Sequence, residues 1–284
     1  MQILVTGSRG FVGTETCKLL EEQGHKIIHY DLMDGYDIMD FEQLLDMAVD
    51  ADRILHLAAL ARFEDCDRNP KLAYDTNVIG TKNVAEVAKY YHIPIVYSST
   101  GSTYMPITQE PPITEDFQTR GNSVYGCSKA VAEKYIQECN PHIILRYAHI
   151  IGFEKRHHGL VGNFISRINK GMKPTLYNGV QSNDFVSVKD IAMANYLALT
   201  ASWDSWNTEY NIGTSEELSA GRAGDIVCEV FGYEGEVEIK KGREVDPIRF
   251  VYNIDKARKC LGFDPQYSFK DAVLEIKKEM DKNA

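Results

Sequence analysis

The first half of the chain alternates short apolar runs with segments that repeat apolar residues at helical spacing. Such alternation is typical of successive βα units, whose strands lie parallel in one sheet. The runs are apolar at consecutive positions, as expected when helices cover both faces of the sheet. The expected strands are QILVT (2–6), KIIHY (26–30), RILHLAA (53–59), PIVYSS (94–99) and HIILRY (142–147). The pattern therefore predicts an α/β fold with a doubly wound parallel sheet.

Helices are expected between these strands, and the pattern loosens beyond about Gly152. The expected helices cover 11–24, 40–49, 70–91 and 125–138, and later 160–170, 188–200, 219–231 and 268–282. Short strands are expected at 174–177, 209–212 and 236–239. We expect a main domain over residues 1–152, with returning segments from about 180–215, and a smaller α/β lobe formed mainly by 153–284.

The composition limits the kinds of partner that the protein is expected to bind. The net charge of −10 disfavours nucleic acid and anionic membranes, because both need a basic face. The six cysteines show no C-x-x-C pair and no metal-ligand spacing, so we expect no metal site and a reduced, cytoplasmic setting. Cys17 and Cys127 lie in helical patterns and are expected to be buried. No stretch approaches the roughly 18 apolar residues of a membrane span, and the start is strand-like.

A glycine-rich turn, TGSRGFVG (6–13), joins the first expected strand to the first helix. Gly7, Gly10 and Gly13 would let backbone N–H groups meet a pyrophosphate at the helix N-terminus, and Asp31 ends the second strand about 20 residues on. We therefore predict a Rossmann-type dinucleotide site rather than a purely structural turn. The Asp31 carboxylate favours NAD, whereas Arg9 favours the 2′-phosphate of NADP, and we give Asp31 the greater weight.

Two further features accompany this turn. The strand end SSTGSTY (98–104) carries more hydroxyl groups than a turn needs. The segment YGCSK places Tyr125 and Lys129 on one helix face, where an ammonium would stabilise a phenolate. The spacing alone also occurs by chance. Together with the glycine turn, it predicts a tyrosine that acts as an acid and a base.

These segments together resemble an extended short-chain dehydrogenase/reductase of the NAD-dependent epimerase/dehydratase family. The matching segments, in the family's order, are TGSRGFVG, Asp31, YDIMD, HLAALA, NVIGT, SSTGSTY, YGCSK, LRYAHIIG, SNDFVSVKDIA, YNIGTSEELS and REVD. The resemblance covers almost the whole chain. It implies an NAD-binding Rossmann domain and a C-terminal lobe that binds a nucleotide-sugar.

The resemblance also implies roles for single residues. The glycines would cradle the pyrophosphate, Asp31 would hold the adenosine ribose, and Asp37 and Ile38 would border the adenine. Tyr125, Lys129 and Thr100 would form the catalytic set, with Lys129 also on the nicotinamide ribose. The matching cofactor positions are Gly7, Arg9, Gly10, Phe11, Val12, Gly13, Asp31, Asp37, Ile38, Leu57, Ala58, Ala59, Asn77, Ser98, Ser99, Tyr125 and Lys129.

The residues after Thr100 bear on the reaction. In relatives that dehydrate the sugar, this threonine is followed by Asp and Glu, and the decarboxylases keep the Glu. Here Gly101 and Ser102 occupy these positions, and neither can act as a general acid or base near neutral pH. The reaction that remains possible is oxidation of the sugar at C4, followed by non-stereospecific return of the hydride to the same carbon. This outcome resembles the UDP-hexose 4-epimerases, among them the UDP-glucose 4-epimerases.

The substrate lobe departs from the epimerase pattern. His149 stands where the family has Asn in RYFN, and Asn183 stands where it has Arg in RDF. REVD retains Arg243 for the diphosphate and Asp246 for the ribose. The remaining substrate candidates are Thr100, Asn163, Tyr177 as a stacking partner of the base or a core aromatic, and Arg249 as a second cation or a surface residue. The segment 154–158 is expected to be a solvated loop.

Two other functions remain open. A nucleotide-4-ketosugar reductase or C4 dehydrogenase would use the same Tyr–Lys–Thr set once per turnover and would consume NAD(P)H. A non-catalytic NAD-binding sensor is the second alternative, although such relatives commonly lose the Tyr or the Lys. The resemblance further implies a homodimer that pairs the helices near 70–91 and 125–138.

Overall fold

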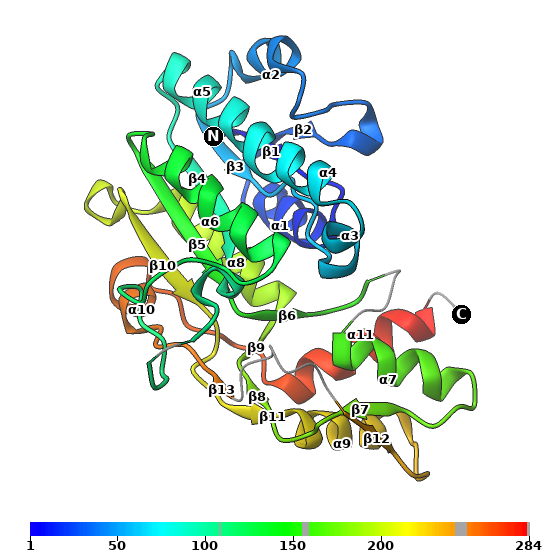
Figure 1. The fold of residues 1–284 in the computed structure, drawn as a ribbon. Coiled ribbons are helices and arrows are strands. Elements are labelled where there is room, and N and C mark those ends of the chain that lie inside the picture. Colours follow the sequence, from blue (N-terminus) through cyan, green and yellow to red (C-terminus); the bar gives the residue numbers. More distant parts are fainter. Residues whose placement is uncertain (108, 155–158, 242–248, 283–284) are drawn as a thin grey trace.

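A six-stranded parallel sheet forms the centre of the larger lobe (Figure 1). The structure is a computed structural model that describes residues 1–107, 109–154, 159–241 and 249–282. The strand order is β2-β1-β3-β4-β5-β10, and every neighbouring pair is parallel, which confirms the predicted α/β fold. The strands are β1 (Gln2–Thr6), β2 (Lys26–Tyr30), β3 (Arg53–His56), β4 (Ile95–Thr100), β5 (His142–Tyr147) and β10 (Thr208–Ile212).

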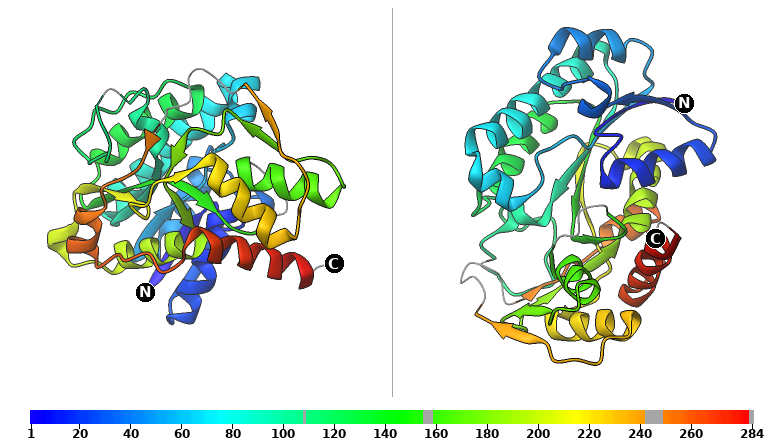
Figure 2. Two further views of the ribbon diagram at one scale, coloured as in Figure 1. Left: turned by 90° about the horizontal axis from the view of Figure 1, so that it is seen from below. Right: turned by 90° about the vertical axis from the view of Figure 1, so that its right-hand side faces the viewer.

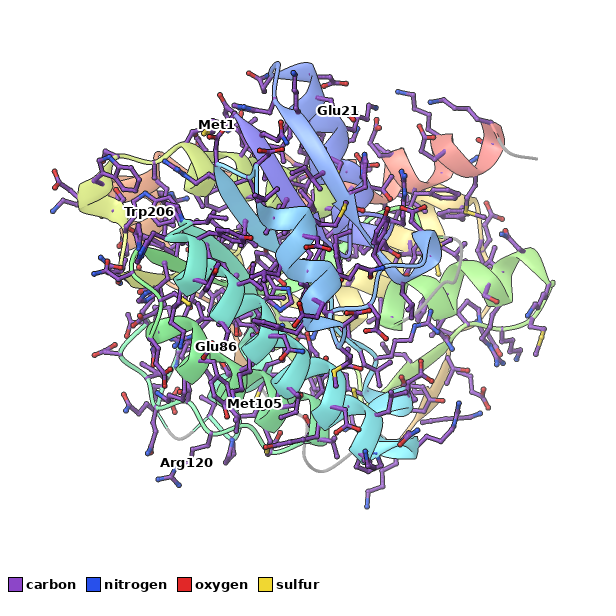
Figure 3. All side chains as sticks on the ribbon, turned by 90° about the horizontal axis from the view of Figure 1, so that it is seen from above. Met1, Glu21, Glu86, Met105, Arg120 and Trp206 are labelled. Carbon is purple, nitrogen blue, oxygen red and sulfur yellow. The ribbon has the colours of Figure 1, made fainter. Side chains whose placement is uncertain are left out.

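Helices cover both faces of this sheet (Figure 2). One face carries α2 (Phe41–Ala48), α5 (Thr81–Tyr91) and α6 (Val124–Gln137), and the other carries α1 (Phe11–Glu22) and α8 (Val188–Thr200). In Figure 3, Glu86 of α5 and Glu21 of α1 mark these two sides. Each face buries its own apolar cluster, with Leu44 and Val84 on the α5 side and Leu20 and Ile191 on the α1 side. Burial on both faces explains why the strands are apolar at consecutive positions.

The segment expected as one helix over 70–91 consists of three pieces. A short α4 (Pro70–Tyr74) leads into a π-helical segment, η2 (Asp75–Gly80), and then into α5. π-Helical turns widen a helix locally and often occur at functional sites. Here the widened segment places Asn77 in the interior, fully buried. Before it lies α3 (Phe63–Arg68), which the sequence pattern did not predict.

The smaller lobe is built from α7 (Gly159–Asn169), α9 (Ala220–Phe231) and α11 (Phe269–Lys282), which enclose a third apolar cluster. These helices agree with the expected ranges to within about two residues. Short strands pair beside them: β7 (Thr175–Tyr177) with β12 (Glu238–Lys240), and β6 (His149–Ile151) with β9 (Phe185–Ser187). The third set is β8 (Ser182–Asn183), between β11 (Leu218–Ser219) and β13 (Arg249–Phe250). A further helix, α10 (Asp255–Leu261), was not predicted.

Cysteine burial follows the prediction at one of two positions. Cys17 is buried, but Cys127 is exposed, so the second expectation was wrong. On α6, Lys129 lies over Tyr97 of β4 and Ser128 contacts Asn77, which leaves position 127 toward solvent. All six cysteines are free thiols. None of the helices in the described ranges has the length and apolar character needed to cross a membrane.

Candidate active site at the carboxyl edge of the sheet

From β1 the sheet continues to β2 on one side and to β3 on the other, so the order of the strands reverses between β1 and β3. The loops that carry the predicted site residues all leave the carboxyl ends of the parallel strands. The glycine turn follows β1, Asp31 follows β2, residues 57–59 follow β3, and Thr100 ends β4. In open α/β sheets this crevice is where ligands bind. The topology therefore brings these positions to one edge of the sheet.

The glycine turn is packed too closely to carry side chains. Gly7 has a φ of +71°, and a Cβ added there would lie 2.7 Å from the backbone nitrogen of Ala58. A Cβ on Gly13 would lie 2.1 Å from the carbonyl oxygen of Gly7. Gly10 is the N-cap residue of α1 and has no side chain to cover the first N–H groups of the helix. This cradle fits a pyrophosphate on the helix N-terminus.

Phe11 and Val12 follow the cradle, and their side chains face the protein. A Cβ on Gly152 would meet the Phe11 ring at 2.9 Å, and Val12 packs against the core cluster on the α1 side. Their backbone N–H groups, in the first turn of α1, remain available to a dinucleotide.

Asp31 connects the glycine turn to the turn after β2. Its Oδ2 accepts a hydrogen bond from the backbone N–H of Arg9 at 2.9 Å, and its Oδ1 accepts one from the N–H of Met33 at 2.9 Å. Asp31 thereby caps a single 3₁₀ turn, η1 (Leu32–Asp34). The side chain of Arg9 forms an ion pair with Asp34, with Nε 2.8 Å from Oδ2.

The residues predicted around the adenine and the cofactor channel are fixed by backbone hydrogen bonds. The carbonyl of Asp37 accepts from the hydroxyl of Tyr30 at 2.8 Å, and Ile38 is buried with only 5% of its surface exposed. The N–H of Ala58, between Leu57 and Ala59, donates to Oγ1 of Thr6 at 3.2 Å.

Asn77 acts as an internal clamp. Its side chain accepts from the N–H of Leu60 at 2.8 Å and donates to the carbonyl of Leu60 and to Oγ of Ser128, both at 3.0 Å. It therefore ties the loop after β3 to α6, one residue before Lys129. The structure places this predicted cofactor residue in a supporting position.

Tyr125 and Lys129 lie on the first turns of α6, with Thr100 beside them. Burial raises the pKa of Tyr125 to about 12, and its hydrogen bond with Thr100 offsets part of this rise. Burial lowers the pKa of Lys129 to about 7, and its ammonium lies 4.2 Å from the centroid of the Tyr97 ring. Thr100 is the group whose hydrogen bond lowers the pKa of Tyr125 in this structure, and the role of Lys129 toward the phenolate stays a prediction.

Phe63 was not predicted as a site residue. Its ring contacts the ring of Tyr125 edge-on, with centroids 5.4 Å apart. It belongs to α3, a helix of six residues that is too short to give a clear periodic signal.

Ser98 and Ser99 do not present free hydroxyls to a cofactor. Ser98 donates to the carbonyl of His56 at 3.1 Å, and Ser99 donates to Oε1 of Glu133 at 2.5 Å. Glu133 in turn binds Arg146 through two N–H···O contacts of 3.0 and 2.8 Å, and all these side chains are buried. The two hydroxyls thus hold β4 to its neighbours in this structure, and the position of Ser98 and Ser99 beside a cofactor stays a prediction. Glu133, four residues beyond Lys129 on the same helix, was the sequence signal for this network.

Gly101 has no room for a side chain. A Cβ at this position would lie 2.2 Å from Cζ of Phe250 and 2.6 Å from Oη of Tyr252. The ring of His149, which is exposed, packs against the rings of Phe250 and Phe185 at 5.7 and 5.8 Å. The aromatic side chains of Phe250 and Tyr252 thus fill the space beside Gly101, and the exposed His149 packs against Phe250.

The other predicted substrate residues differ in exposure and in their contacts, and two of them are not described by the structure. Tyr177 is 52% exposed, so the core alternative was wrong. Asn163 accepts a hydrogen bond from the backbone N–H of Thr175 at 3.3 Å and so joins α7 to β7. Arg243 and Asp246, like residues 155–158, lie outside the described residues.

Arg249 is held at the surface by Glu217. The guanidinium donates from Nε and Nη2 to both carboxylate oxygens at 2.8 and 2.7 Å, which lowers the pKa of Glu217 to about 2. Side chains of neighbouring strand residues point to opposite faces. Because Phe250 faces Gly101, Arg249 faces away from Thr100, as its surface interpretation predicted.

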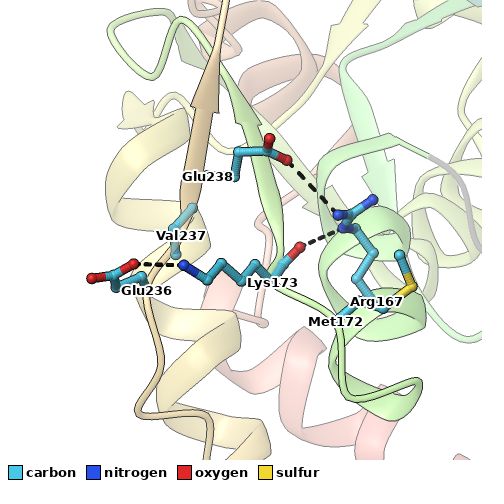
Figure 4. Close-up of a pocket in the computed structure, with 6 residues that line it drawn as sticks. All are labelled: Arg167, Met172, Lys173, Glu236, Val237 and Glu238. Carbon is cyan, nitrogen blue, oxygen red and sulfur yellow. Dashed lines mark hydrogen bonds and ion pairs between the residues drawn. The ribbon is translucent and has the colours of Figure 1, made fainter.

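One hollow lies away from this edge, in the smaller lobe. It has a volume of about 600 Å³ between α7 and β12, and Arg167–Glu238 and Lys173–Glu236 ion pairs cross it (Figure 4). A second cavity of about 50 Å³ adjoins the glycine turn at Phe11 and Gly152. The converging chemical groups at the carboxyl edge define the candidate site. Within the described ranges, no group of three or more His, Cys, Asp or Glu is placed to hold a metal ion.

A glycine cradle at a helix N-terminus, an acidic residue after β2 and a Tyr–Lys pair beside Thr100 define a dinucleotide-dependent site of the short-chain dehydrogenase/reductase class. A family model agrees with this class and specifies one family within it. The chain belongs to the NAD dependent epimerase/dehydratase family, whose model matches residues 3–213.

Similar proteins span the whole chain. A Methanocaldococcus jannaschii protein, provisionally named as a UDP-glucose 4-epimerase, is 31% identical over 99% of both chains. The structure of a UDP-glucose 4-epimerase with UDP-glucose from Thermotoga maritima has a TM-score of 0.92 at 26% identity and covers 100% of this chain and 99% of its own. The structure of the Thermus thermophilus UDP-glucose 4-epimerase with NAD has a TM-score of 0.88 at 25% identity and covers 100% of both chains.

Proposed function

We propose that the chain is a nucleotide-sugar 4-epimerase of the UDP-hexose type. The observation that carries this proposal is the closure of position 101 by Phe250 and Tyr252, next to an intact Thr100–Tyr125–Lys129 set. An acid beside the sugar would be needed to expel a hydroxyl. Position 101 has no room for one, and position 102 is a serine. The site therefore supports proton and hydride transfer at one carbon.

The cofactor residues fit NAD by their geometry. The cradle of Gly7, Gly10 and Gly13 would take the pyrophosphate, and Asp31 would accept hydrogen bonds from the adenosine ribose. Bound NAD would supply a hydride acceptor and donor for C4 of the sugar.

The chain's own residues would move the proton. Tyr125 would accept the proton of the sugar 4-hydroxyl and return it at the end of turnover, and the Thr100 hydroxyl would share a hydrogen bond with it throughout. Lys129 would hold positive charge behind the tyrosine and bond the nicotinamide ribose. For epimerisation, the oxidised sugar must turn over within the site while its nucleotide stays bound.

The nucleotide would bind the smaller lobe. Tyr177 is exposed and free to stack on a base, and His149 lies exposed beside the aromatic group at Gly101. Arg243 and Asp246 complete the proposed set by sequence alone. The two structures with UDP-glucose and NAD described above support UDP and NAD as the ligands.

Exchange of Tyr125 for phenylalanine tests the catalytic assignment. Tyr125→Phe removes the proton-transfer group and leaves the ring that packs on Phe63. We expect kcat for C4 epimerisation of UDP-glucose to fall by about 10²- to 10⁴-fold, the usual contribution of a general acid–base, while NAD stays bound. Turnover close to that of the wild type would refute the assignment.

The ketosugar reductase is the second candidate, and cofactor use separates the two. Arg9 favoured NADP and so kept this alternative open, but Asp34 holds its guanidinium. An epimerase needs no added cofactor, whereas a reductase oxidises one NAD(P)H for each product formed.

A further inference from the structure

The ion pair between Arg9 and Asp34 joins the two turns that flank the proposed adenosine ribose position. Arg9 lies inside the glycine turn, and Asp34 ends the 3₁₀ turn that Asp31 caps. The guanidinium Nε lies 2.8 Å from Oδ2 of Asp34, and the side chains are 46% and 34% exposed. The backbone N–H of Arg9 also donates to Asp31, so all three residues meet at one point.

The charge at this point decides how the site treats a 2′-phosphate. Two carboxylates and one guanidinium leave a net charge of −1, and a phosphate monoester carries about −1.5 to −2 at neutral pH. Arginine binds phosphate well because its planar fork donates in parallel to two oxygens. In this structure Nε of that fork already donates to Asp34.

We propose that Asp34 is a specificity-determining residue that excludes NADP by holding Arg9. Without Asp34, Arg9 would be a cation beside the ribose 2′ position and would attract NADP. With Asp34, the same arginine is neutralised and the site keeps an excess of negative charge. Discrimination against the wrong ligand by such a repulsive arrangement is a general route to specificity. The inference rests on Asp31 lying at the adenosine ribose, and it holds for either proposed reaction.

Competition between the two dinucleotides tests this role directly. The full chain is dialysed against an equimolar excess of NAD and NADP, and the bound dinucleotides are released by denaturation and quantified by chromatography. Their ratio gives the ratio of affinities without any enzymatic assay. For Asp34→Asn we expect the ratio of bound NADP to NAD to rise about tenfold over the wild type, the size of one charge-assisted hydrogen bond.

Two further variants separate a released Arg9 from a general change in charge. In Arg9→Ala/Asp34→Asn the ratio should return to within about twofold of the wild type, because the cation is gone. Asp46→Asn removes the same charge from an exposed position on α2 and should leave the ratio unchanged.

Three results would overturn the proposal: no change in Asp34→Asn, the same rise when Arg9 is absent, or the same rise in Asp46→Asn. Failure of the wild type to bind either dinucleotide would overturn the cofactor site and this inference with it. A chain that binds NAD selectively but epimerises no sugar would leave the inference standing and would contradict only the proposed reaction.

Discussion

Lys129 is only 2% exposed, and the face of the Tyr97 ring lies under its ammonium. Burial disfavours the charged form of a lysine and lowers its pKa. A pKa near 7 in the folded chain, against 10.5 for a free lysine, corresponds to a destabilisation of roughly 4 to 5 kcal/mol at neutral pH. The fold thus carries a costly buried residue, and its proposed catalytic role gives a reason for it.

We expect Lys129→Met to make the fold more stable. The variant replaces a buried ammonium by an apolar chain of similar length, so the free energy of unfolding at pH 7 should rise by about 2 to 4 kcal/mol, after loss of the contact with Tyr97. Urea unfolding of protein freed of dinucleotide measures this change. Lys134→Met, at an exposed position of the same helix, is the matched control and should change stability little.

The low pKa of Lys129 also predicts how the stability of the wild type changes with pH. Below pH 7 the lysine is charged in both the folded and the unfolded chain, and the full cost of burial applies. Between pH 7 and about 10.5 the folded chain has already lost the proton that the unfolded chain keeps, so wild-type stability rises with pH. The stability advantage of Lys129→Met should therefore shrink from pH 7 toward pH 10. A pH-independent difference would contradict the low pKa.

Among the secondary-structure elements, the short strand β13 closes one side of the site. It has two residues, and through Phe250 it closes the space beside Gly101 at the end of β4. This contact joins the two lobes at the position where the sequence resemblance implies an acid in dehydratases.

Adding one methyl group at this contact should disturb the site. In Gly101→Ala, the new Cβ would lie 2.2 Å from the Phe250 ring, so the ring or β4 must shift. Overpacking of this kind costs about 1 to 3 kcal/mol, and we expect kcat to fall as Thr100 moves. Thermal unfolding and kcat measure the two effects.

A second substitution separates crowding from other causes. Gly101→Ala/Phe250→Leu should be more stable than Gly101→Ala, although Phe250→Leu alone removes buried apolar surface. A double variant whose loss equals the sum of the single losses would show that the two positions do not collide.

The longer elements could be predicted from sequence because their signal is local. Strands such as β1 and helices such as α9 repeat apolar residues at their own period, and Gly24 and Gly232 end helices with positive φ. β8 and β13 have two residues each and exist only because distant segments pair. No local pattern marks such strands.

The site residues also fall into those that local sequence predicts and those that it does not. Gly7, Asp31 and Thr100 follow strand ends, so the parallel sheet predicts their common edge. The contacts of Asp34 with Arg9 and of Phe250 with Gly101 depend on side-chain packing between separate segments, which sequence spacing does not encode. Ser99 was predicted from its position alone, and its contact with Glu133 is visible only in the folded chain.

At the scale of the whole molecule, α4 and α6 leave apolar side chains in solvent. Leu72 is 47% exposed and Val131 is 42% exposed, on the helices for which the sequence resemblance implies pairing across a two-fold axis. We expect a homodimer through this surface, with twice the chain mass of 32.1 kDa in light scattering.

One charge should separate the subunits. Val131→Glu would place a carboxylate in the proposed interface, and we expect a monomer at micromolar concentration. Leu274→Glu, at a position 45% exposed on α11, serves as the control and should remain dimeric. A monomeric wild type, or a Val131→Glu variant of unchanged mass, would contradict this interface.

The central claim is that the site exchanges hydride at C4 of a nucleotide-sugar with no net consumption of cofactor. The full chain is incubated with UDP-glucose, UDP-galactose and their N-acetylated and uronic acid counterparts, with no cofactor added, and configuration at C4 is followed by NMR. We predict conversion of at least one substrate to an equilibrium mixture of both C4 epimers, and no conversion by Tyr125→Phe over the same time. Retention of C4 configuration in every substrate, with reduction of 4-keto sugars on addition of NAD(P)H, would contradict the account.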